Sequence, residues 1–88
     1  MEDNRNVELG GLIAKWRRAA GLTQAALADT LGTQQTTVSK LEAGFYRLTV
    51  VQMLSILDAC GISLPDVAED IQRVASAGDV PIWERVNE

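Results

Sequence analysis

The chain has 88 residues, which suits one small domain, and 47% of them are hydrophobic and 23% charged, as in ordinary globular proteins. Its apolar runs fall far short of the roughly 20 residues that a membrane span needs, and no signal peptide is expected. A single cysteine excludes an internal disulfide, and the lack of histidine leaves no metal-ligand spacing. We expect a cytoplasmic protein that uses no membrane, metal or cofactor.

The net charge of −4 counts against nucleic-acid binding, because proteins that bind DNA usually carry a basic surface. The excess of acid is unevenly distributed. Residues 1–44 carry five basic and five acidic side chains, whereas residues 45–88 carry three basic and seven acidic ones. The neutral first half can still present lysine and arginine on one face, and the local potential there decides what that face binds.

The first predicted helix covers residues 7–20 and follows a flexible start over residues 1–6. Its apolar residues recur at the spacing of one helical face: Leu9, Leu12, Ile13, Trp16 and Ala20. Gly21 follows at the position of a C-cap, where glycine accepts the left-handed backbone.

The second predicted helix covers residues 24–31. Thr23 can cap its start with the side-chain hydroxyl, and Gly32 can end it by adopting a positive φ angle. Ala28 is small at the position where a neighbouring helix would approach most closely. A helix of this length is not stable alone, so it must pack on its neighbours.

The third predicted helix covers residues 35–43 and ends at Gly44. Val38 and Leu41 form a narrow apolar stripe, and the rest of its surface is polar. We therefore expect a large part of this helix to face something other than the core.

A fourth and a fifth helix follow. Thr49 can cap the fourth, which runs up to Gly61, and Ser63 can cap the fifth, where Pro65 lies in the first turn and its missing N–H costs little. The predicted apolar stripe of the fourth helix consists of Val50, Met53, Leu54, Leu57 and Cys60. The stripe of the fifth consists of Leu64, Val67, Ala68, Ile71, Val74 and Ala75.

Residues 77–88 form a tail rich in apolar and aromatic side chains. Its Ile82 and Trp83 fit an intramolecular contact and a dimer or partner contact equally well. The predicted fold class is therefore all-α, with five short helices around one core over residues 7–76 and a short C-terminal tail.

The strongest motif covers residues 24–43, where two short helices joined by a tight turn would cross at a steep angle. Together with its flanks, this segment resembles the Cro/phage-repressor (Xre-type) helix-turn-helix family. The resemblance is carried by Gly21-Leu22-Thr23-Gln24, Leu27-Ala28, Leu31-Gly32, Thr37-Val38-Ser39-Lys40-Leu41-Glu42-Ala43-Gly44, Leu48-Thr49 and Leu57-Asp58-Ala59-Cys60-Gly61-Ile62. It covers about residues 9–71 and implies a five-helix, lambda-repressor-like DNA-binding domain.

Four residues depart from the family's pattern. Ala26 stands where many members have a glutamate that completes a capping box, and Gln34 stands where a small capping residue is usual. Thr33 replaces a more apolar turn residue, and Ala43 replaces a polar or basic one. None of these departures breaks the fold, although the last two, Thr33 and Ala43, affect the start of the third helix and its phosphate contacts.

The resemblance implies that the third helix lies in the major groove of double-stranded DNA, with its N-terminal residues against the bases. Gln35, Thr36 and Lys40 are then the candidate base-reading residues, since glutamine can pair with adenine and lysine can reach guanine. The candidates for contacts with the backbone or with flanking groups are Gln24, Thr33, Gln34, Thr37, Ser39 and Arg47.

Other polar and special residues have structural interpretations. Arg17 and Glu42 match a family pair that forms a salt bridge between the first and third helices. Lys15 and Arg18 are expected on a solvated face, and Cys60 is expected to be a small buried hydrophobe.

We expect a sequence-specific transcriptional regulator, a homodimeric repressor on a palindromic operator. The runner-up is an antitoxin or protein-interaction module in which DNA binding is secondary or lost, because the acidic fifth helix and the apolar tail suit a protein partner such as a toxin or another regulator. An enzyme is not expected, because no catalytic constellation is present.

Overall fold

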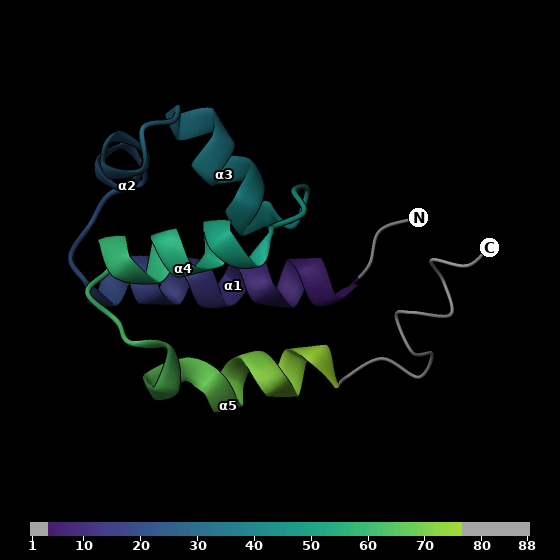
Figure 1. Cartoon of the computed structure of the whole chain (residues 1–88). Coiled ribbons are helices and arrows are strands. Elements are labelled where there is room, and N and C mark those ends of the chain that lie inside the picture. Colours follow the sequence, from purple (N-terminus) through teal and green to yellow (C-terminus); the bar gives the residue numbers. More distant parts are fainter. Residues whose placement is uncertain (1–3, 77–88) are drawn as a thin grey trace.

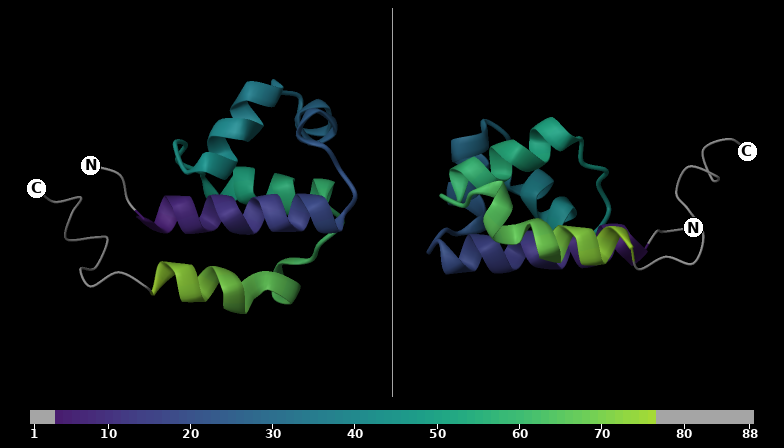
Figure 2. Two further views of the ribbon diagram at one scale, coloured as in Figure 1. Left: turned by 180° about the vertical axis from the view of Figure 1, so that it is seen from behind. Right: turned by 60° about the horizontal axis from the view of Figure 1, so that its bottom comes forward.

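The computed structural model describes residues 4–76, and the described chain forms five helices and no strand. They are α1 (Asn4–Ala19), α2 (Gln24–Leu31), α3 (Gln35–Ala43), α4 (Val50–Ala59) and α5 (Leu64–Ala75). Helices α2 and α3 lie on one side of α1 and α5 lies on the other (Figures 1 and 2). The predicted all-α class is confirmed, and the tail over residues 77–88 lies outside the described part.

Helix α1 begins at Asn4 rather than at residue 7, so residues 4–6 belong to a helix and not to a flexible start. The first turn of α1 contacts the end of α5. The Arg5 guanidinium donates a hydrogen bond of 3.5 Å to the carbonyl oxygen of Ala75, the last residue of α5. Helix α1 thus begins earlier than predicted at a point where it contacts α5. The spacing of residues within α1 does not reveal such a contact.

Two of the three predicted capping residues make the expected hydrogen bond at the start of a helix. The Thr23 hydroxyl accepts a hydrogen bond from the Ala26 N–H at 3.0 Å. Thr49 and Gln52 form a full capping box, with hydrogen bonds of 2.9 and 3.1 Å. Ser63 makes no side-chain capping bond, contrary to expectation, although Pro65 does lie at the start of α5.

One hydrophobic core holds the helices together. Its fully buried side chains come from α1, α2, α3 and α4: Ile13, Leu27, Val38, Ile56 and Leu57. Trp16 and Cys60 are buried as predicted, and α5 contributes Val67 to the same cluster. The core therefore lies between the helix-turn-helix and the remaining helices, which keeps α3 in a defined orientation.

The predicted stripe of α4 is partly wrong. Val50 is 75% exposed and Leu54 is 43% exposed, whereas Ile56, which the pattern did not select, is 1% exposed. Helix α4 reads VVQMLSILDA, so apolar residues occur on nearly every side of it. The period of 3.6 residues identifies a buried face only when the opposite face is polar, and here it is not.

Two glycines allow α1 to approach the end of α3 closely. A methyl group at Gly10 would lie 2.5 Å from the carbonyl oxygens of both Leu41 and Glu42. At Gly44, where φ is +88°, it would lie 2.7 Å from the Cα atom of Val7. The backbones of α1 and α3 are thus in direct contact, and the position of α3 depends on the absence of side chains here.

An ion pair fixes the same crossing from the other side. The Arg17 Nε donates to Glu42 Oε2 at 2.6 Å and Nη2 donates to Glu42 Oε1 at 3.1 Å, while Nη1 donates to the Leu22 carbonyl at 2.9 Å. The Gln24 amide donates to Glu42 Oε1 at 2.9 Å. Glu42 therefore joins α1, α2 and α3, and the Arg17 and Glu42 side chains are only 11% and 8% exposed.

The pKa values of this pair move in the directions that stabilise the charged forms. The hydrogen bond with Glu42 raises the pKa of Arg17 against the opposing effect of burial. For Glu42, burial acts to raise the pKa, but the hydrogen bonds from Arg17 and Gln24 and the positive charge of Arg17 together lower it. Both groups are therefore ionised at neutral pH.

A substitution pair tests the close approach of α1 and α3. Gly10→Ala should lower the free energy of unfolding by about 1–3 kcal/mol, because the new methyl group meets backbone atoms that cannot move aside. Gly11→Ala is the matched control. Nothing lies within 4 Å of its added methyl group, so it should stabilise the helix by about 0.5–1 kcal/mol. Urea unfolding followed by circular dichroism measures both, and equal effects would contradict the described packing.

Acid should weaken the protein through Glu42. Because its folded-state pKa is lowered, its stabilising effect is present above the unfolded value of 4.5 and is lost as the pH falls through the lower folded value. The melting temperature of the wild type should fall in this window more steeply than that of Glu42→Gln. At neutral pH, Glu42→Ala should cost about 3–5 kcal/mol by leaving Arg17 buried without its partner. An unchanged acid profile in Glu42→Gln would refute this account.

Candidate nucleic-acid interface

One face of α3 is polar and exposed to solvent. The hydrophobic core determines the orientation of this face, because the opposite face of α3 packs into the core. Val38 and Leu41 are buried, so the opposite side of the helix points outward. The residues that fall on this outward side are Thr36, Ser39, Lys40 and Ala43, and all four are exposed. Helix α3 stands at the top edge of the molecule in Figure 1, with α1 and α5 below it.

The predicted base-reading residues lie on or beside this outward face. Thr36 and Lys40 are one helical turn apart, and Gln35 is exposed at the first position of α3. None of these three side chains is needed for the core. They are therefore free to contact a molecule that lies along the helix.

The start of α3 also faces solvent. Gln34 occupies the N-cap but makes no side-chain capping hydrogen bond, and Thr33 and Gln34 are exposed. Thr37 is half-buried, and Ser39 is exposed on the outward side. An uncapped helix start presents backbone N–H groups and a partial positive charge, which suits a phosphate group.

The side chain of Gln24 has a partner inside the protein. Its amide donates to Glu42, as described above, and the residue is half-buried at the start of α2. The side chain of this predicted phosphate contact is therefore held in place by the ion pair. The structure brings Gln24, Arg17 and Glu42 together and sets them apart from the outward face of α3.

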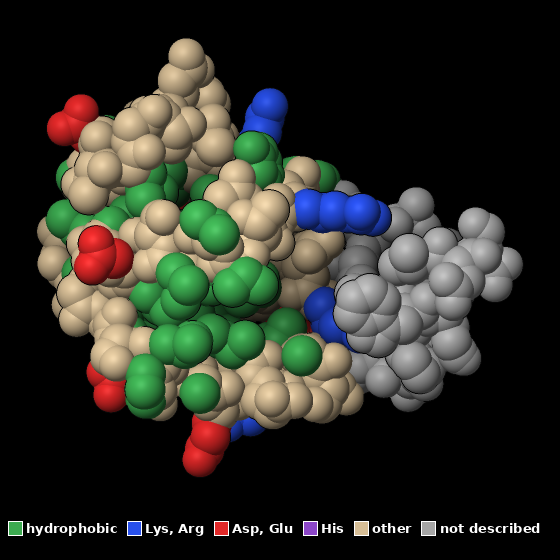
Figure 3. Space-filling model, in the orientation of Figure 1, with side chains coloured by type: hydrophobic (Ala, Val, Ile, Leu, Met, Phe, Trp, Pro, Cys, Tyr) green, Lys and Arg blue, Asp and Glu red, His purple; other side chains and the backbone are tan. Residues whose placement is uncertain are grey.

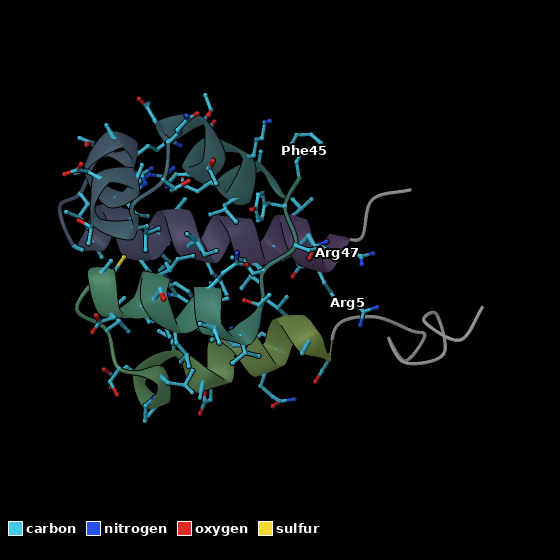
Figure 4. The ribbon with its side chains drawn as sticks, turned by 45° about the horizontal axis from the view of Figure 1, so that its top comes forward. Arg5, Phe45 and Arg47 are labelled. Carbon is cyan, nitrogen blue, oxygen red and sulfur yellow. The ribbon has the colours of Figure 1, made fainter. Side chains whose placement is uncertain are left out.

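The loop between α3 and α4 extends the exposed surface. Phe45 is 66% exposed, and Tyr46 and Arg47 are exposed beside it. Arg47, Phe45 and Arg5 lie at the same end of the molecule, where α3 ends and α1 begins (Figure 4). Sequence reasoning selected Arg47 alone, because Arg5 seemed to belong to a flexible start and Phe45 to a linker.

Charged side chains are unevenly spread over the face of the molecule drawn in Figure 3. On that face, basic side chains gather toward the end where α1 begins, and acidic side chains lie mainly toward the opposite end and below, by α5. The first turn of α5 carries Asp66, and Asp70 forms an ion pair of 3.1 Å with Arg73. The net negative charge of the chain is thus compatible with a locally basic end near α3.

Two features of other functional classes are missing from residues 4–76. No cluster of three or more histidine, cysteine, aspartate or glutamate side chains there is arranged to hold a metal ion. None of the described helices is long and apolar enough to cross a membrane.

Comparison with known proteins agrees with this geometry. The model of the helix-turn-helix domain family matches residues 8–69. A comparison with curated protein sequences finds no match.

Solved structures of bacterial regulators share the fold. The clp gene regulator ClgR from Corynebacterium glutamicum is 25% identical, with a TM-score of 0.71 over 82% of this chain and 92% of that one. The restriction-modification controller protein C.AhdI from Aeromonas hydrophila is 26% identical, with a TM-score of 0.67 over 73% and 93%. A point mutant of the controller protein C.Esp1396I is 25% identical, with a TM-score of 0.73 over 83% and 92%.

The matched structures are of a gene regulator and of restriction-modification controller proteins. The family model covers both helices of the motif, the ion pair that holds them and the exposed face of α3. The chain therefore belongs to the helix-turn-helix domain family.

Proposed function

We infer that this protein is a sequence-specific transcriptional regulator that acts in the cytoplasm as a homodimeric repressor. The observation that carries this function is the outward polar face of α3, where Thr36 and Lys40 project from a helix whose other face is fixed in the core. In this function α3 lies in the major groove, and Gln35, Thr36 and Lys40 contact the edges of bases.

Contacts with the DNA backbone flank these base contacts. The uncapped start of α3 with Thr33, Gln34 and Thr37 would face a phosphate on one side, and Ser39 and Arg47 would face the backbone further along. At Gln24, the backbone N–H groups at the start of α2 would contact a phosphate. The Gln24 side chain would keep its hydrogen bond to Glu42. The similarity to two restriction-modification controller proteins supports a regulatory role.

The acidic surface of α5 favours a second candidate function. Asp66 and Glu69 are exposed and Asp70 lies beside them, so a basic protein could dock there. In this function the protein is an antitoxin or interaction module whose partner is a toxin or another regulator, and DNA binding is secondary. A binding experiment with DNA separates the two functions.

Binding to duplex DNA should select a sequence and weaken as salt is added, because phosphate contacts release counterions. We expect Lys40→Ala and Gln35→Ala to reduce the preference for the selected site by about 1–3 kcal/mol each. Arg47→Ala should lower the affinity for all DNA sequences alike. It should also reduce the slope of the logarithm of the binding constant against the logarithm of the salt concentration by about one. Fluorescence anisotropy with the selected and a scrambled duplex measures these effects.

Lys15→Ala is the matched control, since Lys15 is an exposed lysine on α1 away from the outward face of α3. It should leave both affinity and preference unchanged. If the wild type binds neither duplex at low salt, the regulator function fails and the interaction module takes its place.

A further inference from the structure

The end of the molecule where α1 begins carries an exposed apolar pair with basic side chains near it. Phe45 is 66% exposed and Val7 is 42% exposed. The two lie close together, because a methyl group at Gly44, the neighbour of Phe45, would be 2.7 Å from the Cα atom of Val7. Arg5 and Arg47 lie at the same end (Figure 4). We define the end patch as Arg5, Val7, Phe45 and Arg47.

The packing of residues 4–76 leaves the apolar part of the end patch uncovered. Phe45 follows the C-cap Gly44, so its ring leaves the chain where α3 has already ended. Neither Phe45 nor Val7 belongs to the core cluster or packs against it. Exposed apolar side chains with polar neighbours of this kind often mark a contact site. Glu8 is exposed beside Val7, but the two arginines outnumber it, so the end patch is basic overall.

The chain leaves α5 at the border of the end patch. Ala75 is the last residue of α5, and its carbonyl oxygen accepts the hydrogen bond of 3.5 Å from the Arg5 guanidinium. The end of α5 and the start of α1 lie side by side in Figures 1 and 2. The residues that follow Ser76 in the sequence therefore start beside the end patch.

The order of side chains in this following segment is complementary to the end patch. The four consecutive apolar residues Val80-Pro81-Ile82-Trp83 stand between Asp79 and Glu84. An apolar centre with an acidic residue on each side suits an apolar pair with basic residues near it, in both hydrophobicity and charge. A DNA phosphate could use the arginines but would leave the apolar pair without a partner.

The segment is long enough to reach the end patch of its own chain. Trp83 is seven residues beyond Ser76, which allows a separation of up to about 23 Å. Helix α1 lies between α5 and α3 (Figure 1), and a helix with its side chains is about 10–12 Å across. Because the segment and the patch belong to one chain, the effective concentration is on the order of millimolar, so that modest complementarity is enough for docking.

We propose that residues 79–84 dock on the end patch of the same chain and compete there with DNA. The apolar residues 80–83 would cover Phe45 and Val7, and the acidic residue on each side would face an arginine. Arg47 is a proposed DNA-backbone contact, so the docked segment and DNA exclude each other. The competition rests on the proposed function, whereas the docking does not. A segment that covers the patch in about nine of ten molecules would lower the apparent affinity for DNA about tenfold.

Quenching of tryptophan fluorescence by acrylamide in the full chain tests the docking without DNA. The chain has two tryptophans, and Trp16 is only 4% exposed, so the quenching reports mainly on Trp83. Phe45→Ser should raise the quenching constant at least about twofold, because Trp83 loses its aromatic partner. The fold should be retained, since Phe45 is exposed. The matched control is Leu64→Ser, a 45% exposed residue at the far end of α5, which should leave the quenching unchanged.

The exposed apolar side of α4 is the competing seat for the segment. Val50 is 75% exposed there, and Val50→Ser should not change the quenching of Trp83. If Val50→Ser releases Trp83 and Phe45→Ser does not, the segment lies on α4 and the proposal is overturned. A Trp83 that is as accessible in the wild type as in Phe45→Ser would also overturn it.

Fluorescence anisotropy with the selected duplex tests the competition. Trp83→Ser changes no charge, so a higher affinity for DNA cannot come from added attraction to phosphate. It should raise the affinity about tenfold. The double variant Trp83→Ser with Phe45→Ser should bind no more tightly than Trp83→Ser alone, because both changes remove the same contact. Asn87→Ser, outside the docked residues, should leave the affinity unchanged. A Trp83→Ser variant with wild-type affinity would overturn the competition.

Failure of the docking and failure of the proposed function give different results. If Phe45 protects Trp83 from quenching but no variant binds DNA, the docking stands and the regulator function fails. If the wild type binds the selected duplex while its Trp83 is fully accessible, the regulator function stands and the docking fails.

Discussion

Glu42 of α3, with the groups that bind it, is the contact on which the position of the helix-turn-helix depends. Its carboxylate accepts hydrogen bonds from Arg17 of α1 and Gln24 of α2, so that one side chain connects three helices. A buried carboxylate without such partners would be costly, and here every buried polar side-chain atom among the described residues has a partner. The close contact of Gly10 with the end of α3 fixes the distance at the same crossing, while the ion pair fixes the relative rotation.

This arrangement separates stability from recognition on a very short helix. Val38, Leu41 and Glu42 face inward and hold α3, and the outward side carries side chains that the fold does not use. Residues such as Thr36 and Lys40 can therefore change without loss of the core, and the fold can present different side chains to different DNA sequences. A rigid helix with replaceable outward residues is what a sequence-reading surface requires.

The distribution of charge and apolar surface reconciles an acidic protein with a DNA-binding fold. Long-range attraction to DNA depends on the local potential, which the basic end near α3 and α1 supplies. Four of the seven acidic side chains among the described residues lie on α4 and α5, at Asp58, Asp66, Glu69 and Asp70. Within residues 4–76, the apolar side chains of Val50, Val51 and Leu54 on α4 remain exposed.

Local chemistry in the sequence determined the motif and most of the helix boundaries, although not the start of α1. Thr23 and Thr49 start helices because their hydroxyls accept backbone N–H bonds, and Gly32 and Gly44 end them because glycine tolerates a positive φ. The polar outward face of α3 could also be recognised, since the rest of that helix is so narrowly apolar. Only the tertiary structure decided which side of α4 is buried, because that helix is apolar on nearly every side. It alone also showed Arg5 at the end of α5 and Gln24 bound to Glu42, since such contacts join residues far apart in the chain and leave no periodic signal in the sequence.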